Sequence, residues 1–238
     1  MKYLNQIVCG DALDLMPDIP SQSVLVLADP PYGIGESMKA SKVRGTAVRQ
    51  KSGNILYVPE NDYEYEEWDK ERWSAEYFYE MFRVGRNQII FGGNYYSDIL
   101  PVSPGWVVWD KCNGSSDYSD VELIWTSFQR GARLFRYMWN GMMQGKSIEE
   151  GYIPQGNKRL NEKRFVPGQK PVNLIIWFLL NYAWEGDIVL DPCCGSGTTA
   201  EACIRTGHPF ICFEKSEKRV EIARERIRPW LEQMRLPV

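Results

Sequence analysis

Short runs of apolar residues alternate with longer amphipathic stretches along most of this chain. A run such as Val24 to Leu27 has the length of a buried strand, whereas Pro171 to Trp184 has the length of a helix. Strands that alternate with helices are typical of a mainly parallel sheet with helices on both faces. The pattern predicts strands at Gln6–Cys9, Val24–Leu27, Gln88–Phe91, Trp106–Trp109, Leu134–Met138, Ile188–Leu190 and Phe210–Phe213, and helices at Ser74–Arg83, Pro171–Trp184, Thr198–Arg205 and Glu217–Leu231.

Two stretches interrupt this pattern and are predicted to be loops. Residues 36–53 have no apolar periodicity, and residues 140–168 are rich in glycine, polar and basic residues. Loops of this length in a compact domain are usually functional or disordered, and we expect residues 36–53 to be a mobile loop. Gly207 suits the position after the third predicted helix, and Ser216 suits the N-cap of the last one. We therefore expect one α/β domain over residues 1–238.

Composition narrows the class of protein. The chain is 44% hydrophobic and 25% charged, and no apolar run approaches the ~20 residues that a membrane helix needs. The N-terminus lacks the apolar stretch of a secretory signal, so we expect a cytoplasmic protein without a membrane partner. The six cysteines are not spaced as Cys-x-x-Cys, and the one histidine, His208, follows a glycine. Reduced thiols and no metal site are therefore expected.

Charge is distributed unevenly although the net charge is only −3. Residues 36–53 contain five basic residues and one acid, and residues 128–170 contain nine basic residues and three acids. Residues 54–80 between them carry nine acids against two basic residues. Such runs are often only solvated surface. Basic segments that also contain aromatic residues are compatible with a nucleic-acid surface as well.

A glycine-rich turn follows the predicted strand at Ile188–Leu190. It reads Asp191-Pro192-Cys193-Cys194-Gly195-Ser196-Gly197-Thr198-Thr199 and leads into a helix. Glycines let backbone approach a ligand closely, and a helix N-terminus offers free N–H groups. Glu214 ends the next strand and is suited to accept from two ribose hydroxyls, which indicates a nucleoside-binding fold. The turn also matches a nicotinamide dinucleotide fingerprint, so on this motif alone an oxidoreductase stays open.

A second motif, Asp29-Pro30-Pro31-Tyr32, follows the predicted strand at Val24–Leu27. The two prolines stiffen the chain and remove two N–H donors. The Asp29 carboxylate and the nearby carbonyls are then acceptors with few local donors, and an exocyclic amino group would satisfy them. The ring of Tyr32 offers a stacking face for an aromatic base. This corner favours amino-group methylation over hydride transfer.

Together the two motifs resemble those of the amino-group DNA methyltransferases that use S-adenosylmethionine. The Asp-Pro-Pro-Tyr motif precedes the donor motif by about 160 residues, as in the permuted β-group of that family, which includes phage and restriction–modification enzymes. In related RNA and protein-glutamine methyltransferases the donor motif comes first, so the motif order disfavours those two classes. The resemblance implies a Rossmann-like methyltransferase fold with a seven-stranded, mostly parallel sheet and helices on both faces.

The resemblance also implies roles for individual residues. Gly10-Asp11-Ala12 matches the Gly-Asp that opens the family pattern, with Asp11 accepting from the donor's adenine amino group. Val166-Pro167-Gly168-Gln169-Lys170-Pro171 retains only part of the family's His-Pro-Thr-Gln-Lys-Pro, and Lys170 would pair with the donor's carboxylate. The predicted catalytic residues are Asp29, Pro30, Pro31 and Tyr32. The predicted donor-binding residues are Asp11, Ala12, Asp29, Lys170, Asp191, Cys193, Gly195, Gly197, Thr198, Thr199 and Glu214.

The reaction implied by the resemblance is methylation of the N6 amino group of adenine in double-stranded DNA. The target base would be flipped out of the helix, and no metal would be needed. Residues 112–168 are the segment with room for DNA recognition. The sequence does not give the oligomeric state, and a homodimer is a candidate because relatives are often dimers. Family members with Asp at the first motif position mostly modify adenine, whereas Ser there is typical of cytosine-N4 enzymes. A cytosine-N4 enzyme and an inactive DNA-binding relative remain the alternatives.

Overall fold

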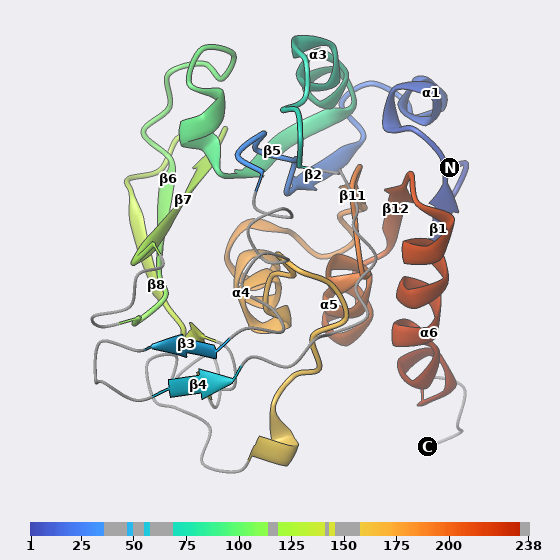
Figure 1. Cartoon of the computed structure of the whole chain (residues 1–238). Coiled ribbons are helices and arrows are strands. Elements are labelled where there is room, and N and C mark those ends of the chain that lie inside the picture. Colours follow the sequence, from blue (N-terminus) through green and yellow to red (C-terminus); the bar gives the residue numbers. More distant parts are fainter. Residues whose placement is uncertain are drawn as a thin grey trace.

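An eight-stranded mixed sheet forms the centre of the computed structural model, which describes residues 1–35, 47–49, 55–57, 69–113, 119–140, 143–145 and 158–233 (Figure 1). Every pairing in this sheet is parallel except the two made by one strand, Val121–Thr126. In order across the sheet, the strands are β1 (Gln6–Cys9), β12 (Phe210–Glu214), β11 (Val189–Asp191), β2 (Val24–Ala28), β5 (Gly85–Phe91), β7 (Val121–Thr126), β6 (Trp106–Asp110) and β8 (Arg133–Arg136).

The predicted α/β class and the mostly parallel sheet are confirmed, but the sheet has eight strands where seven were predicted. All seven predicted strands are present with small shifts at their ends. The additional strand is β7, which reads Val-Glu-Leu-Ile-Trp-Thr. Glu122 interrupts its apolar run and a polar stretch precedes it, so the pattern did not predict a strand there. The segment 112–168 therefore contributes β7 and β8 to the scaffold.

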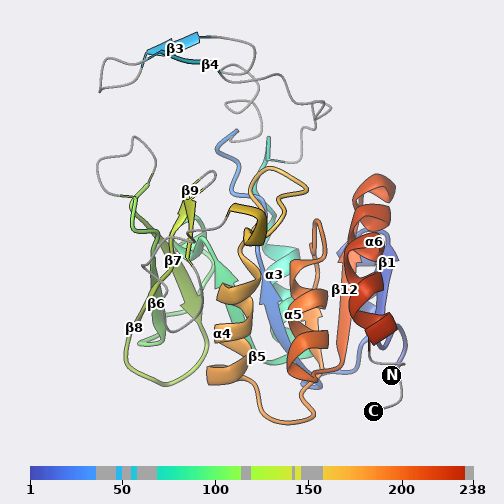
Figure 2. The ribbon, with the colours of Figure 1, turned by 90° about the horizontal axis from the view of Figure 1, so that it is seen from below.

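Helices cover both faces of the sheet (Figure 2). Helices α1 (Ala12–Leu15) and α3 (Ala75–Val84) pack on one face, and α4 (Val172–Tyr182), α5 (Thr198–Thr206) and α6 (Glu217–Gln233) pack on the other. Because side chains alternate along a strand, the fully buried β2 serves both layers: Leu25 and Leu27 join the core under α4, whereas Val24 and Val26 join the core under α3. None of the helices in the described part of the chain is long and apolar enough to cross a membrane.

Several short elements connect these layers. Single 3-10 turns occur at Met16–Asp18, Gly93–Tyr96 and Lys158–Leu160. Two small antiparallel pairs lie outside the main sheet, formed by β3 (Ala47–Arg49) with β4 (Ile55–Tyr57) and by β9 (Trp139–Asn140) with β10 (Met143–Gln144). Strand β3 falls within the predicted loop 36–53, and the remaining residues of that loop lie outside the described residues.

Helix ends follow the local sequence signals. Gly207 caps α5 with a φ of +76°, as predicted, and the hydroxyl of Ser216 accepts from the Arg219 amide at 3.4 Å in the first turn of α6. Gly197 precedes α5 with a φ of +78°, and a Cβ there would lie 2.8 Å from the Cβ of Ala223. Glycine at position 197 therefore permits the close approach of α5 to α6.

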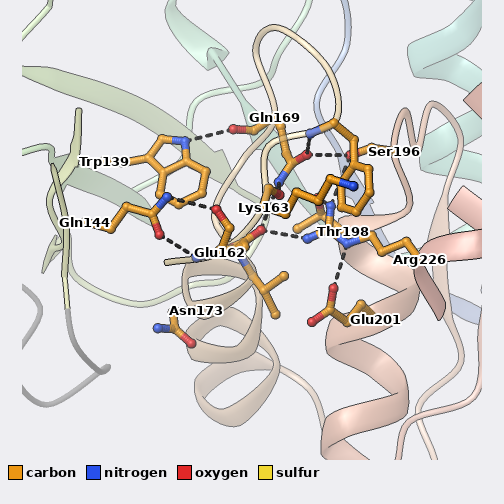
Figure 3. A network of polar contacts seen from close by, with 12 residues as sticks. Trp139, Gln144, Glu162, Lys163, Gln169, Asn173, Ser196, Thr198, Glu201 and Arg226 are labelled. Carbon is orange, nitrogen blue, oxygen red and sulfur yellow. Dashed lines mark hydrogen bonds and ion pairs between the residues drawn. The ribbon is translucent and has the colours of Figure 1, made fainter. Parts of the chain in front are cut away.

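A buried arginine joins α6 to the two segments beside it (Figure 3). The Arg226 side chain is 3% exposed and lies 2.6 Å from carboxylate oxygens of both Glu162 and Glu201. Its remaining guanidinium nitrogen donates to the hydroxyls of Ser196 and Thr198, each at 3.1 Å. One cation thus neutralises two carboxylates and holds the start of α5.

Glu162 belongs to residues 158–170, here called the connecting segment, which leads into α4. Its backbone N–H and C=O pair with the side-chain amide of Gln144 at 2.8 and 3.0 Å. Its carboxylate accepts from the Val172 amide and from the side chain of Gln169, each at 2.9 Å. Gln169 in turn accepts from the Ser196 hydroxyl at 3.0 Å (Figure 3). These bonds fix the connecting segment against the glycine-rich turn before α5.

Replacing Arg226 is expected to destabilise the fold strongly. Arg226→Ala removes the cation that lies 2.6 Å from the Glu162 carboxylate and leaves Glu201 with only the longer contact to Arg205 at 3.3 Å. Removing one partner of a buried ion pair costs about 3–5 kcal/mol. Urea unfolding measures the loss. The matched control is Arg228→Ala on the same helix, whose side chain is 58% exposed and pairs with Glu225, and which should change stability far less. Equal losses in the two variants would contradict this role for Arg226.

Candidate active site

The Asp-Pro-Pro-Tyr motif forms a corner at the carboxyl end of β2. The strand ends at Ala28, and the Asp29 side chain that follows is 31% exposed. The hydroxyl of Tyr96, from the turn after β5, donates to the Pro31 carbonyl. Because the prolines cannot donate from their own nitrogens, this bond from Tyr96 helps to fix the corner.

Tyr32 turns back toward the strand it follows. Its hydroxyl donates to Asp29 Oδ1 at 2.7 Å, and its ring stacks on Tyr95 with centroids 4.7 Å apart and planes at 16°. A Cβ at Gly92 would lie 2.2 Å from the Tyr32 ring, so only glycine fits there. One face of the ring is covered by Tyr95, and a ligand can stack only on the other face.

A compact cluster of opposite charges surrounds the Asp29 carboxylate. The Lys170 ammonium lies 2.7 Å from Asp29 Oδ2 and 3.1 Å from Glu122 Oε1. The Tyr32 hydroxyl also lies 3.0 Å from Glu122 Oε1, and Lys111 lies 3.1 Å from Glu122 Oε2. The cluster therefore contains two ammonium groups and two carboxylates.

These contacts set the ionisation of the cluster. Burial raises the pKa of the Asp29 carboxyl, while the neighbouring Lys170 ammonium opposes that rise. Burial alone would raise the pKa of Glu122, but Lys170 and Lys111 outweigh it and lower that pKa to about 2. Burial would lower the pKa of Lys170, but Asp29 and Glu122 raise it above its usual value. Lys170 and Glu122 are therefore charged at neutral pH.

The glycine-rich turn, residues 191–199 and here called the donor loop, lies beside this corner because β11 pairs with β2. Asp191 Oδ1 accepts from the Cys193 amide at 3.0 Å, and Asp191 Oδ2 accepts from the Thr199 hydroxyl at 2.5 Å. Burial raises the pKa of Asp191 to about 7 and raises the pKa of the Cys193 thiol well above its usual value. Asp191 and Thr199 hold the shape of the turn, and the Cys193 thiol stays protonated.

Glu214 ends β12 with its carboxylate fixed by backbone. Oε2 accepts from the Gly195 amide and Oε1 accepts from the Ser216 amide, each at 2.9 Å. Gly195 has a φ of +53°, and a Cβ there would point into open space. Each oxygen of Glu214 keeps a lone pair for a further donor. The donor loop thus presents an oriented carboxylate beside a position without a side chain.

Asp11 lies next to these groups at the start of α1. Its side chain accepts from the Leu13 amide at 3.0 Å, from the Tyr77 hydroxyl at 2.9 Å, and from Lys215 at 3.1 Å. Partial burial raises the pKa of Asp11, but these hydrogen bonds outweigh it and lower the pKa overall. The carboxylate is therefore ionised and already oriented by the protein.

One cavity of about 510 Å³ joins these parts. Of the predicted site residues, Pro30, Tyr32 and Gly197 do not line it; Gly197 packs against α6 instead. Trp73 and Tyr77, stacked with ring centroids 4.2 Å apart, add an aromatic wall that the sequence did not identify. The predicted residues that line the cavity are Asp11, Ala12, Asp29, Pro31, Lys170, Asp191, Cys193, Gly195, Thr198, Thr199 and Glu214.

The sequence also missed Glu122 and Lys111. Glu122 is the one charged residue in the six-residue strand β7, and it shares a strand face with Ile124 and Thr126 because side chains alternate. A carboxylate within a mostly apolar strand is the signal that could have found it. The ion pair between Lys170 and Asp29 had no such signal, because the two residues are 141 positions apart.

Three described basic residues of 128–170 lie at opposite ends of the strands. Arg136 ends β8 at the cavity edge and lies 3.3 Å from Asp110. Arg133 begins β8 at the opposite edge, and Arg130 donates to the carbonyl of Asn181 near the end of α4. Lys39, Lys42 and Arg44 of the predicted basic loop lie outside the described residues. Among the residues that are described, no group of three or more His, Cys, Asp or Glu side chains could hold a metal ion.

Comparison with known proteins places the chain in a family. The family model described as DNA methylase, which covers N6 and N4 enzymes, matches residues 93–225, more than half of the chain. The type II methyltransferase M.HinfI of Haemophilus influenzae is 26% identical over 263 aligned positions that cover 95% of this chain and 69% of that protein. M.HpaI of Haemophilus parainfluenzae is 25% identical over 250 positions that cover 93% and 74%.

Solved structures share the fold. The complex of M1.HpyAVI with SAM has a TM-score of 0.53 at 18% identity, covering 93% of this chain and 98% of that one. The cytosine-N4-specific PvuII DNA methyltransferase has a TM-score of 0.53 at 15% identity, covering 96% and 92%. The cavity with its Asp-Pro-Pro-Tyr corner and donor loop, the family match and the shared fold lead to one conclusion: the chain belongs to the amino-group (N6/N4) DNA methyltransferases of the restriction–modification type.

Proposed function

We propose that this enzyme methylates the N6 amino group of adenine in double-stranded DNA, with S-adenosylmethionine as methyl donor. The observation that carries the proposal is the shared cavity: Asp29 of the corner and Glu214 of the donor site line the same 510 Å³ space. Acceptors for an amino group and acceptors for a nucleoside therefore lie within reach of one another.

The cavity fits the methyl donor. The Glu214 carboxylate is fixed by two backbone amides and keeps acceptor capacity for a ribose diol. Gly195 leaves open space where any other residue would have a side chain, and the Trp73–Tyr77 wall offers an aromatic surface. When bound, S-adenosylmethionine supplies a sulfonium methyl group as the electrophile. The solved complex of M1.HpyAVI with SAM supports the same donor here.

The corner supplies the groups that act on the target amine. We assign Asp29 and the Pro30 carbonyl as acceptors of the two amino hydrogens. As the nitrogen attacks, it gains positive charge, so both hydrogen bonds strengthen toward the transition state. The nitrogen would form its new bond to the methyl carbon as the bond from that carbon to the donor sulfur breaks, with the neutral thioether as leaving group. The nitrogen would then lose one proton, which Asp29 accepts and passes to water. Lys170 opposes protonation of Asp29 before the reaction.

The target base must leave the helix to reach this corner. We assign the face of the Tyr32 ring that Tyr95 does not cover as the surface on which the base stacks. Stacking and two hydrogen bonds hold the amine in position, and positioning of this kind contributes a large share of catalysis. We propose that residues of 112–168 outside β7 and β8 read the DNA sequence.

Adenine is proposed over cytosine because Asp occupies the first motif position. A charged acceptor makes hydrogen bonds about twice as strong as a neutral one, and the resemblance associates Asp there with adenine enzymes. The fold itself does not separate the two bases, since the PvuII enzyme with the same fold is cytosine-N4-specific. Cytosine N4 is therefore the second candidate target, served by the same acceptors.

Methylation of unmodified DNA tests the proposal directly. We expect tritiated methyl groups from S-adenosylmethionine to enter DNA, and nucleoside digestion with mass spectrometry to return mainly N6-methyladenine. Asp29→Asn, which keeps the shape of the side chain but loses its charge, should abolish transfer while donor binding stays within several-fold. Mainly N4-methylcytosine among the products would overturn the choice of adenine, and full activity in Asp29→Asn would remove Asp29 from the chemistry.

Donor affinity should depend on Glu214. A hydrogen bond to a charged acceptor contributes about 1.5–3 kcal/mol, so Glu214→Gln is expected to weaken S-adenosylmethionine binding by roughly ten- to a hundred-fold. Calorimetry without DNA measures this independently of activity. Glu217→Gln, an exposed carboxylate in the first turn of α6, is the control and should bind normally. An unchanged affinity in Glu214→Gln would place the ribose elsewhere.

DNA affinity should fall with salt even though the whole chain is acidic. If ~4 to 6 basic side chains meet phosphates, the slope of log affinity against log salt is about −4 to −5. Replacing Lys39, Lys42 and Arg44 together by Gln should make that slope shallower. The control replaces Arg86 and Arg133, at the starts of β5 and β8, together with Arg228 on α6, and should leave the slope unchanged. Equal slopes for both triple variants would contradict phosphate contacts by Lys39, Lys42 and Arg44.

A further inference from the structure

Glu122 has no place in either sequence motif, yet it lies 3.0 Å from the Tyr32 hydroxyl of the corner. Its strand β7 is antiparallel to its neighbours, so the start of β7 lies where β5 and β6 end. Trp109, near the end of β6, pairs with Glu122 in register. The one reversed strand of the sheet therefore delivers a carboxylate to the edge where Asp29 lies.

The contacts of Glu122 are to groups that themselves hold Asp29. Glu122 Oε1 accepts from Lys170 at 3.1 Å and lies 3.0 Å from the Tyr32 hydroxyl, whose single proton it shares with the nearer Asp29 Oδ1. Those same two groups donate to the two oxygens of Asp29, each at 2.7 Å. Asp29, Tyr32, Glu122 and Lys170 thus form a closed ring, in which each carboxylate is bridged to the other twice.

Charge in this ring is balanced and shielded from water. The side chains of Lys170 and Glu122 are 11% and 12% exposed, and Lys111 at 22% completes the pairing of Glu122. Lys111 lies over the ring of Trp109 at 5.0 Å, which keeps its stem packed. Two cations and two anions in a largely buried site depend on one another, because removing one leaves a net charge with little water to screen it.

We propose that Glu122 is a positioning residue for methyl transfer, acting through Tyr32 and Lys170 to hold Asp29 as an oriented acceptor. The inference rests on the proposed function and deepens it. Glu122 does not touch the target base in this assignment; it fixes the two donors that orient Asp29, and Lys111 balances its charge. Lys111 and Glu122 are thus assigned to the catalytic apparatus.

The arrangement predicts that removing the charge of Glu122 and removing the charge of Lys111 shift the pKa of the Asp29 carboxyl in opposite directions. The charge of Glu122 disfavours ionisation of Asp29, and the charge of Lys170 favours it. Glu122→Gln keeps an acceptor oxygen but removes the negative charge, so Asp29 should ionise at lower pH. Lys111→Met keeps the apolar stem but leaves Glu122 with one cation fewer, so Asp29 should ionise at higher pH. The other groups that face Asp29 stay unchanged in both variants: Tyr32, Tyr96, Asp191, Cys193 and Lys170.

The test is the pH dependence of single-turnover methylation at saturating donor. On the acid side of the rate profile, the pH at which the rate is half-maximal should fall by about one unit or more in Glu122→Gln. This is the usual effect of a charge within a few ångströms. The half-maximal pH should rise, by less, in Lys111→Met, and the double variant should return toward the unaltered profile. Glu225→Gln on the surface of α6 is the control and should not move it.

A merely structural role would lower the rate in both single variants without moving the half-maximal pH, and no compensation would appear in the double variant; that result would overturn the inference. If Glu122→Gln does not fold, judged by circular dichroism, the upward shift in Lys111→Met still decides the question. Carbon NMR can measure the pKa of the Asp29 carboxyl without relying on activity. That pKa should be lowest in Glu122→Gln, intermediate in the unaltered chain and highest in Lys111→Met. Failure of the proposed function can be told apart from failure of this inference. If the proposed function is wrong, the unaltered chain transfers no methyl group to DNA, whatever the order of the Asp29 pKa values by NMR.

Discussion

Parallel pairing between β2 and β11 is the constraint on which this site depends. Val26 lies opposite Leu190 and Leu25 lies opposite Val189, so both strands end at the same edge of the sheet. Asp29 and the donor loop begin there, although about 160 residues separate them in the chain. The order of the two motifs along the chain has no effect on their distance in space.

Much of this edge could be predicted from the sequence because its signals are local. The β2 corner needs an apolar run, a carboxylate and two prolines, and the donor loop needs glycines after a strand. Each is contained within ten residues. Glu214 accepts from two backbone amides beside the same turn, so an oriented carboxylate next to the glycine-rich turn could be predicted from the sequence.

What could not be predicted depends on contacts between distant residues. Strand β7 carries a charged residue where an apolar one would mark a strand, and that residue is tolerated because Lys170 and Lys111 approach from other elements. Lys170 was expected at the carboxylate of the donor, yet its ammonium lies against Asp29. The nearest partners of a long, flexible side chain are decided by the assembled fold, and no spacing in the sequence encodes them.

Strand β8 closes one side of the sheet, and its outer edge pairs with no other strand in the described part of the chain. Such an edge is a template on which a second molecule can add its own strand, which leads to aggregation. Leu134 is 53% exposed on it and would favour that contact. Arg133 and Arg136 flank this leucine along the strand, so two molecules that approached edge to edge would bring four guanidinium groups together. Charges of this kind along an open strand disfavour edge-to-edge pairing of two molecules.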